Sequence, residues 1–241
     1  MITNTNLENY EYLKNLNSHY NYDLDLIKNL SEKIIIKTNN HLDLIPKISL
    51  EQKSKLLELL NITINFFNFN NIEYWLDGGT LLGACRNNKF IDWDDDVDLA
   101  IPLKSYIKLK NLFKTDTLII SPIVKIIEHS NPNVYDKTKP YMFRSYYIDS
   151  QDFFIDIIIY QKFNNYYTGN NTNWIDKYYY FEEEIYPLKL ITFENQNYYI
   201  INNPEPYLNR AYYFWKHFIV VSHAHRKELE STRNYFTYYI I

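Results

Sequence analysis

The sequence predicts a mixed α/β fold, in which helices flank a mixed sheet and a helical extension precedes it. Residues 51–67 carry apolar side chains at helical spacing along one face. Residues 96–101 alternate polar and apolar side chains, which is the period of a half-buried strand. Residues 153–160 are apolar except for Asp156, which is typical of a strand covered on both faces.

The N-terminal segment, residues 1–45, is predicted to be helical, and Pro46 marks a break after it. Apolar residues recur there at three-residue spacing in two runs, Tyr10, Leu13 and Leu16, and Leu24, Ile27 and Leu30. We therefore predict three parts of the chain: an N-terminal helical extension over 1–48, a main α/β domain over 49–217 and a C-terminal tail over 218–241.

The other elements follow from turn residues and local periodicity. A short strand over 73–76 leads into a glycine turn, and a helix is expected to begin at Leu81. Further along, we predict strands over 117–121 and 124–128, a hairpin from 188–193 and 198–201, and a proline-started helix over 204–215.

Composition and charge exclude several classes of protein. A chain of 241 residues can bury one substantial core, and its net charge of −4 argues against binding to nucleic acid. The single cysteine, Cys85, rules out a disulfide within the chain. Neither a signal peptide nor an apolar run of about 20 residues is visible, so we expect a soluble cytoplasmic protein without a transmembrane segment. For a viral source, this would be the host cytoplasm or the virion.

The most informative segment is a run of acids: five aspartates lie between Asp92 and Asp98. Clustered carboxylates repel one another unless positive charge lies among them. Asp96 and Asp98 are two residues apart on the predicted strand, so their side chains project from the same face, roughly 6.5–7 Å apart. Such a pair suits a hard divalent cation with oxygen ligands.

A glycine turn lies directly before these acids. The chain has only four glycines, and Gly78, Gly79 and Gly83 belong to this segment. Paired glycines let the backbone approach a ligand closely, and the N–H groups at a helix start attract phosphate. The sequence therefore predicts a phosphate site beside the cation site.

Asp156 is the third acid of interest, because it interrupts an apolar run. A buried carboxylate is normally paired with a cation, since burying it alone costs several kcal/mol or more. One interpretation is a structural salt bridge to an arginine or lysine. We favour the other, in which Asp156 joins Asp96 and Asp98 around a metal ion.

Together these motifs resemble the LicD family of the nucleotidyltransferase superfamily, which includes bacterial phosphocholine transferases and the fukutin-related proteins. The resemblance extends over about residues 56–216. It is carried by GGTLLGACRNNKFIDWDDDVDLAI, FFIDIII, IYPLKLITFENQNYYI and INNPEPYLNRAYYFWK. The chain departs from the family pattern at Asp92, where proline is common, and at Tyr212-Tyr213, where Tyr-Gly is common.

The resemblance implies that residues 49–217 form a nucleotidyltransferase-like catalytic domain. Such an enzyme is a metal-dependent transferase that moves a phosphoryl-alcohol group, such as phosphocholine or ribitol phosphate, from a CDP-activated donor to a glycan hydroxyl. The implied metal is Mg²⁺, with Mn²⁺ as the alternative. Asp96 and Asp98 would hold one or two ions, and Asp156 would complete the metal shell or accept the proton of the attacking hydroxyl.

The resemblance also assigns substrate-binding roles. Gly78, Gly79 and Thr80 would bind the donor phosphates, and Arg86 would contact a phosphate oxygen or, alternatively, pair with a nearby aspartate. Asp94 would orient the loop or a water molecule.

Two other functions stay open. One is a nucleotide-sugar glycosyltransferase with a DxD metal motif, and the other is a LicD-like protein that binds ligand without catalysis.

Overall fold

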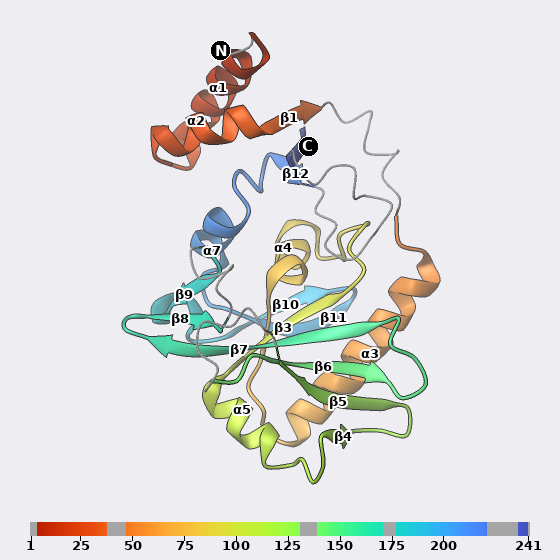
Figure 1. Cartoon of the computed structure of the whole chain (residues 1–241). Coiled ribbons are helices and arrows are strands. Elements are labelled where there is room, and N and C mark those ends of the chain that lie inside the picture. Colours follow the sequence, from red (N-terminus) through yellow and green to blue (C-terminus); the bar gives the residue numbers. More distant parts are fainter. Residues whose placement is uncertain (1–3, 38–46, 131–138, 171–176, 221–235, 241) are drawn as a thin grey trace. The chain divides into compact units, whose positions relative to one another are not determined.

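The computed structural model describes residues 4–37, 47–130, 139–170, 177–220 and 236–240 (Figure 1). The chain divides into two compact units, Lys47–Ala211 and a smaller one formed from the two ends of the chain, Met1–Pro46 and Tyr212–Ile241. The predicted three-part division stays a prediction, but both ends of the chain contribute to one unit.

The larger unit is built on an eight-stranded mixed sheet. Its main path runs β2 (Trp75–Leu76), β3 (Val97–Pro102), β7 (Phe154–Phe163), β6 (Met142–Tyr147), β5 (Val124–His129) and β4 (Thr117–Ile119), and β8 (Tyr166–Gly169) and β9 (Tyr179–Phe181) follow from β7. The β3–β7 pair is parallel and the other pairs are antiparallel. The predicted mixed α/β fold with a helical N-terminal region is confirmed.

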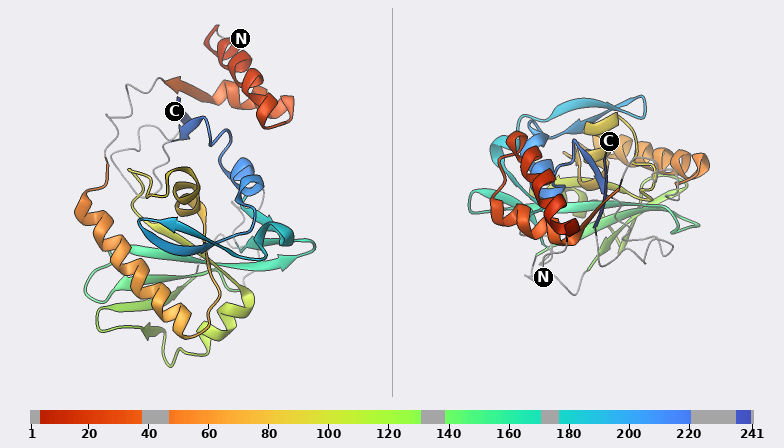
Figure 2. Two further views of the ribbon diagram at one scale, coloured as in Figure 1. Left: turned by 180° about the vertical axis from the view of Figure 1, so that it is seen from behind. Right: turned by 90° about the horizontal axis from the view of Figure 1, so that it is seen from above.

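One face of this sheet is covered by α3 (Leu50–Phe69) and α5 (Leu103–Lys110) (Figures 1 and 2). Helix α3 begins at a capping box, in which Ser49 and Gln52 satisfy each other's backbone N–H groups. The hydroxyl of Thr63 lies 2.9 Å from that of Ser145 on β6, and the ring of Tyr106 on α5 stacks on Phe143 of the same strand. Because side chains alternate along a strand, the residue between them on β6 projects from the opposite face.

The remaining described elements of the larger unit are α4 (Gly78–Asn87), a separate β-hairpin and two short helices. Helix α4 follows β2 directly and begins at Gly78, three residues before the predicted start. The predicted hairpin is present as β10 (Lys189–Phe193) and β11 (Gln196–Ile200), and a short helix, α6 (Glu182–Ile185), precedes it. Helix α7 (Pro204–Ala211) ends four residues before the predicted end, because turns follow and Phe214 adopts a positive φ of 58°.

The smaller unit contains α1 (Asn4–Leu16), the 3₁₀ turn η1 (Asn17–His19) and α2 (Leu24–Lys33), with a three-stranded sheet of β1 (Ile34–Lys37), β13 (Phe236–Ile240) and β12 (Phe218–Val220). Leu13, Ile27 and Leu30 form its buried core with Phe214 and Phe218. The helical prediction is therefore wrong for residues 34–37, where three consecutive isoleucines favour a strand.

Within the described residues, no helix is both long enough and apolar enough to cross a bilayer.

Candidate metal and phosphate site

The three predicted acids come together where β3 and β7 run side by side. Asp98 and Asp156 are register partners in this parallel pair, and Asp96 lies just before β3. One carboxylate oxygen from each of the three residues lies within 4.8 Å of the other two. The spacing of Asp96 and Asp98 was visible in the sequence, and strand pairing adds Asp156.

These carboxylates are crowded and shielded from water. Asp96 and Asp156 are each only 7% exposed, and Asp98 is half-buried. Burial, together with the charges of Asp96, Asp94, Asp156 and Asp77, raises the pKa of Asp98 well above its usual range. The group therefore resists ionisation by itself, and a nearby positive charge would favour the ionised form.

The glycine pair allows the start of α4 to approach these acids. Gly78 has a φ of +50°, and a Cβ there would lie 2.3 Å from Asp98 Oδ2. A Cβ on Gly79 would lie 2.5 Å from Asp94 Oδ2. The Gly79 N–H donates a 3.0 Å hydrogen bond to Asp98 Oδ2, so a group predicted to bind phosphate contacts a carboxylate here. The phosphate roles of Gly78 and Gly79 stay predictions.

Further hydrogen bonds fix β3 against the turn. The Asp98 N–H donates to the Thr80 hydroxyl at 2.9 Å, and the Asp77 N–H donates to the Asp98 carbonyl at 3.0 Å. The predicted phosphate contact of Thr80 is untested. Arg86 lies half-buried in the last turn of α4, and neither of its predicted roles is tested.

Sequence reasoning missed Arg144, which lies on β6 opposite Asp156. Its Nε donates to Asp156 Oδ1, and its Nη2 donates to Oδ2 at 3.1 Å. The guanidinium also stacks on Phe154, 4.4 Å from the ring centroid. Asp156 thus makes the salt bridge of the first interpretation while lying in the acid cluster of the second. A signal existed: in a hairpin centred on Ser150, residues 144 and 156 become partners.

Asp77 was also missed as a site residue. It precedes α4 at the N-cap position, is 1% exposed, and accepts a hydrogen bond from the Tyr180 hydroxyl at Oδ1. Burial raises its pKa, against the opposing effect of the bonds from Tyr180 and Gly78. An acid between a buried strand and a glycine pair was the available signal.

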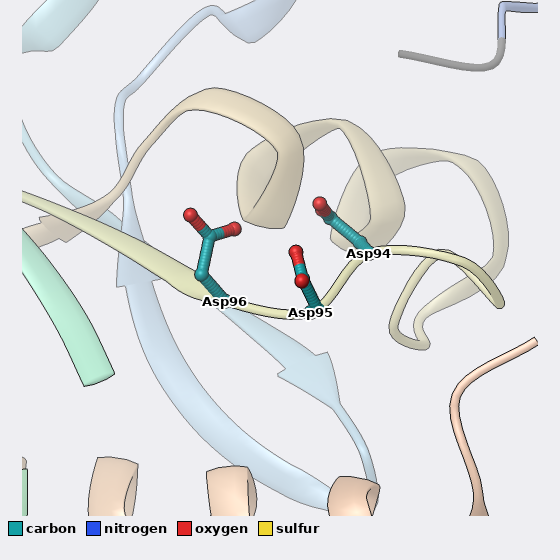
Figure 3. A group of neighbouring side chains, drawn as sticks. All are labelled: Asp94, Asp95 and Asp96. Atoms are coloured by element: carbon teal, nitrogen blue, oxygen red, sulfur yellow. The ribbon is translucent and has the colours of Figure 1, made fainter. Parts of the chain in front are cut away.

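A second cluster shares Asp96 with the first. Oxygens of Asp94, Asp95 and Asp96 also lie within 4.8 Å of one another. Their side chains point to the same side of the loop, toward α4 (Figure 3). Asp94 and Asp95 are half-buried, so the loop presents several acids to one region.

The loop that carries these acids is attached to the start of α3. Asp92 forms salt bridges with Lys47 at 3.2 Å and Lys53 at 2.9 Å, and its carbonyl accepts a 2.7 Å hydrogen bond from the Ile48 N–H. Trp93 is buried beside it. Asp92, one of the positions where the chain departs from the family pattern, therefore anchors the acidic loop.

Residues 71–203 match the family described as LicD/FKTN/FKRP, nucleotidyltransferase domain. Because the match covers more than half of the chain, the chain belongs to this family.

Several curated proteins are similar over shorter stretches. The ribitol 5-phosphate transferase FKRP of Homo sapiens is 43% identical over 49 residues, which is 20% of this chain and 10% of that protein. The lipopolysaccharide cholinephosphotransferase LicD of Haemophilus influenzae is 34% identical over 67 residues, 28% of this chain and 25% of LicD. An uncharacterized protein of Rickettsia prowazekii is 38% identical over 66 residues, 27% of this chain and 25% of its own length. The chain thus spans a quarter or less of each relative.

Proposed function

We propose that this protein is a metal-dependent transferase that moves a phosphoryl-alcohol group from a CDP-activated donor to a glycan hydroxyl. The observation that carries the proposal is the meeting of Asp96, Asp98 and Asp156 within 4.8 Å, beside the glycine turn. Family membership supports a transferase, since FKRP and LicD are named as transferases of ribitol 5-phosphate and cholinephosphate.

The donor set fits a hard divalent cation. Oxygens bound to one Mg²⁺ at 2.0–2.1 Å lie up to roughly 4.2 Å apart, which is close to the 4.8 Å limit that contains the three carboxylate oxygens. Carboxylates this crowded also favour a cation among them, since burial and neighbouring acids oppose the ionisation of Asp98. Asp96, Asp98 and Asp156 would hold Mg²⁺, and Mn²⁺ would suit the same oxygens.

In the proposed reaction, the acceptor hydroxyl oxygen forms a new bond to the donor's alcohol-bearing phosphorus, and the bond from that phosphorus to CMP breaks. The acceptor loses its hydroxyl proton, and CMP leaves. Bound metal would offset negative charge on the donor diphosphate. The N–H groups at the start of α4 and the Thr80 hydroxyl would position the donor, with Arg86 on a phosphate oxygen. Asp156 is the acid that would receive the proton if it does not serve as a ligand alone.

The test is the release of CMP from CDP-choline, CDP-ribitol and CDP-glycerol in Mg²⁺, with a panel of free glycans as acceptors. The wild-type chain should release CMP from at least one donor, and both chelation of the metal and Asp98→Asn should abolish the release. Equal release by the Asp98→Asn variant would overturn the proposal. Release of nucleotide from UDP- or GDP-sugars instead would identify the DxD glycosyltransferase, and donor binding without turnover would identify a non-catalytic relative.

A further inference from the structure

Arg144 lies next to the acid cluster and takes no part in the function proposed so far. Its Nε and Nη2 donate to the two oxygens of Asp156, whose carboxylate also lies within 4.8 Å of Asp96 and Asp98. The guanidinium is therefore separated from the proposed cation by a single carboxylate. Strand alternation places it on the face of β6 opposite Phe143 and Ser145, and so away from α3 and α5.

The guanidinium has donors beyond those that hold Asp156. An arginine carries N–H groups on Nε, Nη1 and Nη2, and the two bonds to Asp156 involve Nε and Nη2. The side chain of Tyr146, on the same strand, is a further hydrogen-bond partner of Arg144. The side chain is 27% exposed, so part of it is accessible to a ligand. Stacking on Phe154 at 4.4 Å fixes the plane of the guanidinium, which lowers the entropy lost when it binds a second group.

The excess of negative charge at the acid cluster favours a positively charged side chain nearby. Three ionised carboxylates outweigh one divalent cation, and Asp94 and Asp95 lie close to Asp96 as well. A cation alone would leave the region negative, which disfavours binding of a diphosphate. Arg144 supplies positive charge beside the third carboxylate, and its planar donors match phosphate oxygens.

We infer that Arg144 binds a phosphate group of the nucleoside-diphosphate donor while it orients Asp156. This inference rests on the proposed function and assigns a residue that the sequence motifs did not indicate. Arg144 would thus join the substrate-binding side of the site, and its bidentate geometry would make lysine an incomplete replacement.

The chain provides a matched control for this inference. Arg210 on α7 also makes a bidentate ion pair, donating from Nη1 and Nη2 to Glu184 at 2.8 and 2.6 Å, and it stacks on Tyr179 at 4.4 Å. Glu184 belongs to neither of the acidic clusters found among the described residues. Arg210→Lys therefore perturbs a similar ion pair outside the site.

The experiment titrates CDP in Mg²⁺ into the full chain and into Arg144→Gln, Arg144→Lys and Arg210→Lys, with thermal unfolding measured for each. Loss of a charged hydrogen bond to phosphate should weaken CDP binding by about 10- to 100-fold in Arg144→Gln. Arg144→Lys should fall between that variant and the wild type, and Arg210→Lys should bind CDP as the wild type does.

Wild-type affinity in a folded Arg144→Gln variant would overturn the inference. If that variant does not fold, Arg144→Lys decides: unchanged CDP affinity overturns the inference, and weakened affinity supports it. Equal weakening in Arg210→Lys would overturn it too, because the effect would then follow from lost stability. If the wild-type chain itself does not bind CDP in Mg²⁺, the proposed function fails and the inference fails with it.

Discussion

Two arginine–carboxylate pairs in the same unit, each with a buried carboxylate and a partly buried guanidinium, have similar local chemistry and different surroundings. Arg144–Asp156 and Arg210–Glu184 are both bidentate, and each guanidinium stacks on an aromatic ring 4.4 Å away. Asp156 lies beside two further acids on adjoining parts of the sheet, whereas Glu184 connects α6 to α7. The ion pair alone therefore does not indicate a site, and the proposed metal site depends on the additional carboxylates around Asp156.

The two ion pairs should differ in what their removal changes. A buried ion pair gains Coulomb energy and loses hydration of both groups, so its net effect on folding is small while either partner's removal is costly. For Arg210–Glu184 the consequence of removal is lost stability. Removing one partner of the Arg144–Asp156 pair would in addition change the charge that a bound ligand meets at the proposed site.

The largest expected difference between the pairs concerns turnover. Asp156→Asn should lower the rate of CMP release by roughly 10³- to 10⁴-fold, or about 4–5.5 kcal/mol, because it removes a charged oxygen at the proposed cation. Glu184→Gln should leave turnover of the folded protein within a few-fold of wild type. Steady-state rates on matched amounts of folded protein check this, and equal losses in both variants would remove the distinction.

The second effect is on stability. Arg210→Met should lower the free energy of unfolding by about 3 kcal/mol, because Glu184 would keep a buried carboxylate without its partner. Urea denaturation measures the loss. The stabilisation produced by added Mg²⁺ should be the same as in wild type, and its disappearance would show that this pair also contributes to the metal site.

The third prediction compares a glycine beside the acid cluster with a glycine elsewhere in the sheet. Gly78→Ala places a Cβ 2.3 Å from Asp98 Oδ2 at a φ of +50°, so it should cost about 1–3 kcal/mol and weaken Mn²⁺ binding. Gly169 on β8 is the matched position, since among the described residues a Cβ there would meet Ile158 alone, at 3.3 Å. Gly169→Ala should preserve Mn²⁺ affinity in calorimetric titration. Unchanged Mn²⁺ affinity in Gly78→Ala would mean that Asp98 does not hold the ion.

The smallest effect belongs to the exposed ion pairs of Asp92. Burial raises the pKa of this carboxyl, but its bonds to Lys53 and Lys47 outweigh burial and lower the pKa overall. The stabilisation is therefore present above the unfolded pKa of about 3.9 and is lost as the pH falls through the lower folded value. Because the side chain of Asp92 is 44% exposed, Asp92→Asn should cost less than about 1 kcal/mol at pH 7.

Denaturation of wild type and Asp92→Asn at several pH values checks this prediction. The difference between the two proteins should shrink once the pH falls below about 4. A difference that persists unchanged at lower pH would show that the effect does not arise from the ionised carboxylate.

Local periodicity was sufficient to predict the two acids at the start of β3, Asp96 just before the strand and Asp98 within it. The alternation in residues 96–101 placed Asp96 and Asp98 on one face, and the apolar run identified β7 around Asp156. Both patterns depend only on residues that are neighbours in the sequence, so they can be recognised without knowing the tertiary structure. The start of α4 was predicted three residues too late, at Leu81. The two glycines at its start lower helix propensity, but tertiary contacts stabilise the first turn.

The rest of the site depends on contacts between distant residues. Arg144 reaches Asp156 only when β6 and β7 pair in the observed register, and Tyr180 reaches Asp77 across 103 residues of chain. Likewise, β1 forms a strand by pairing with β13 near the other end of the chain, and the helical prediction for residues 34–37 overlooked the strand preference of its three isoleucines.

The most direct test is crystallographic. Crystals of the full chain grown with Mn²⁺ should give an anomalous difference peak at the manganese edge, with carboxylate oxygens of Asp96, Asp98 and Asp156 around it, and Asp98→Asn should lose the peak. A structure in Mn²⁺ whose peak lies on Asp94 and Asp95 alone, or which has no peak near β3 and β7, would contradict the account.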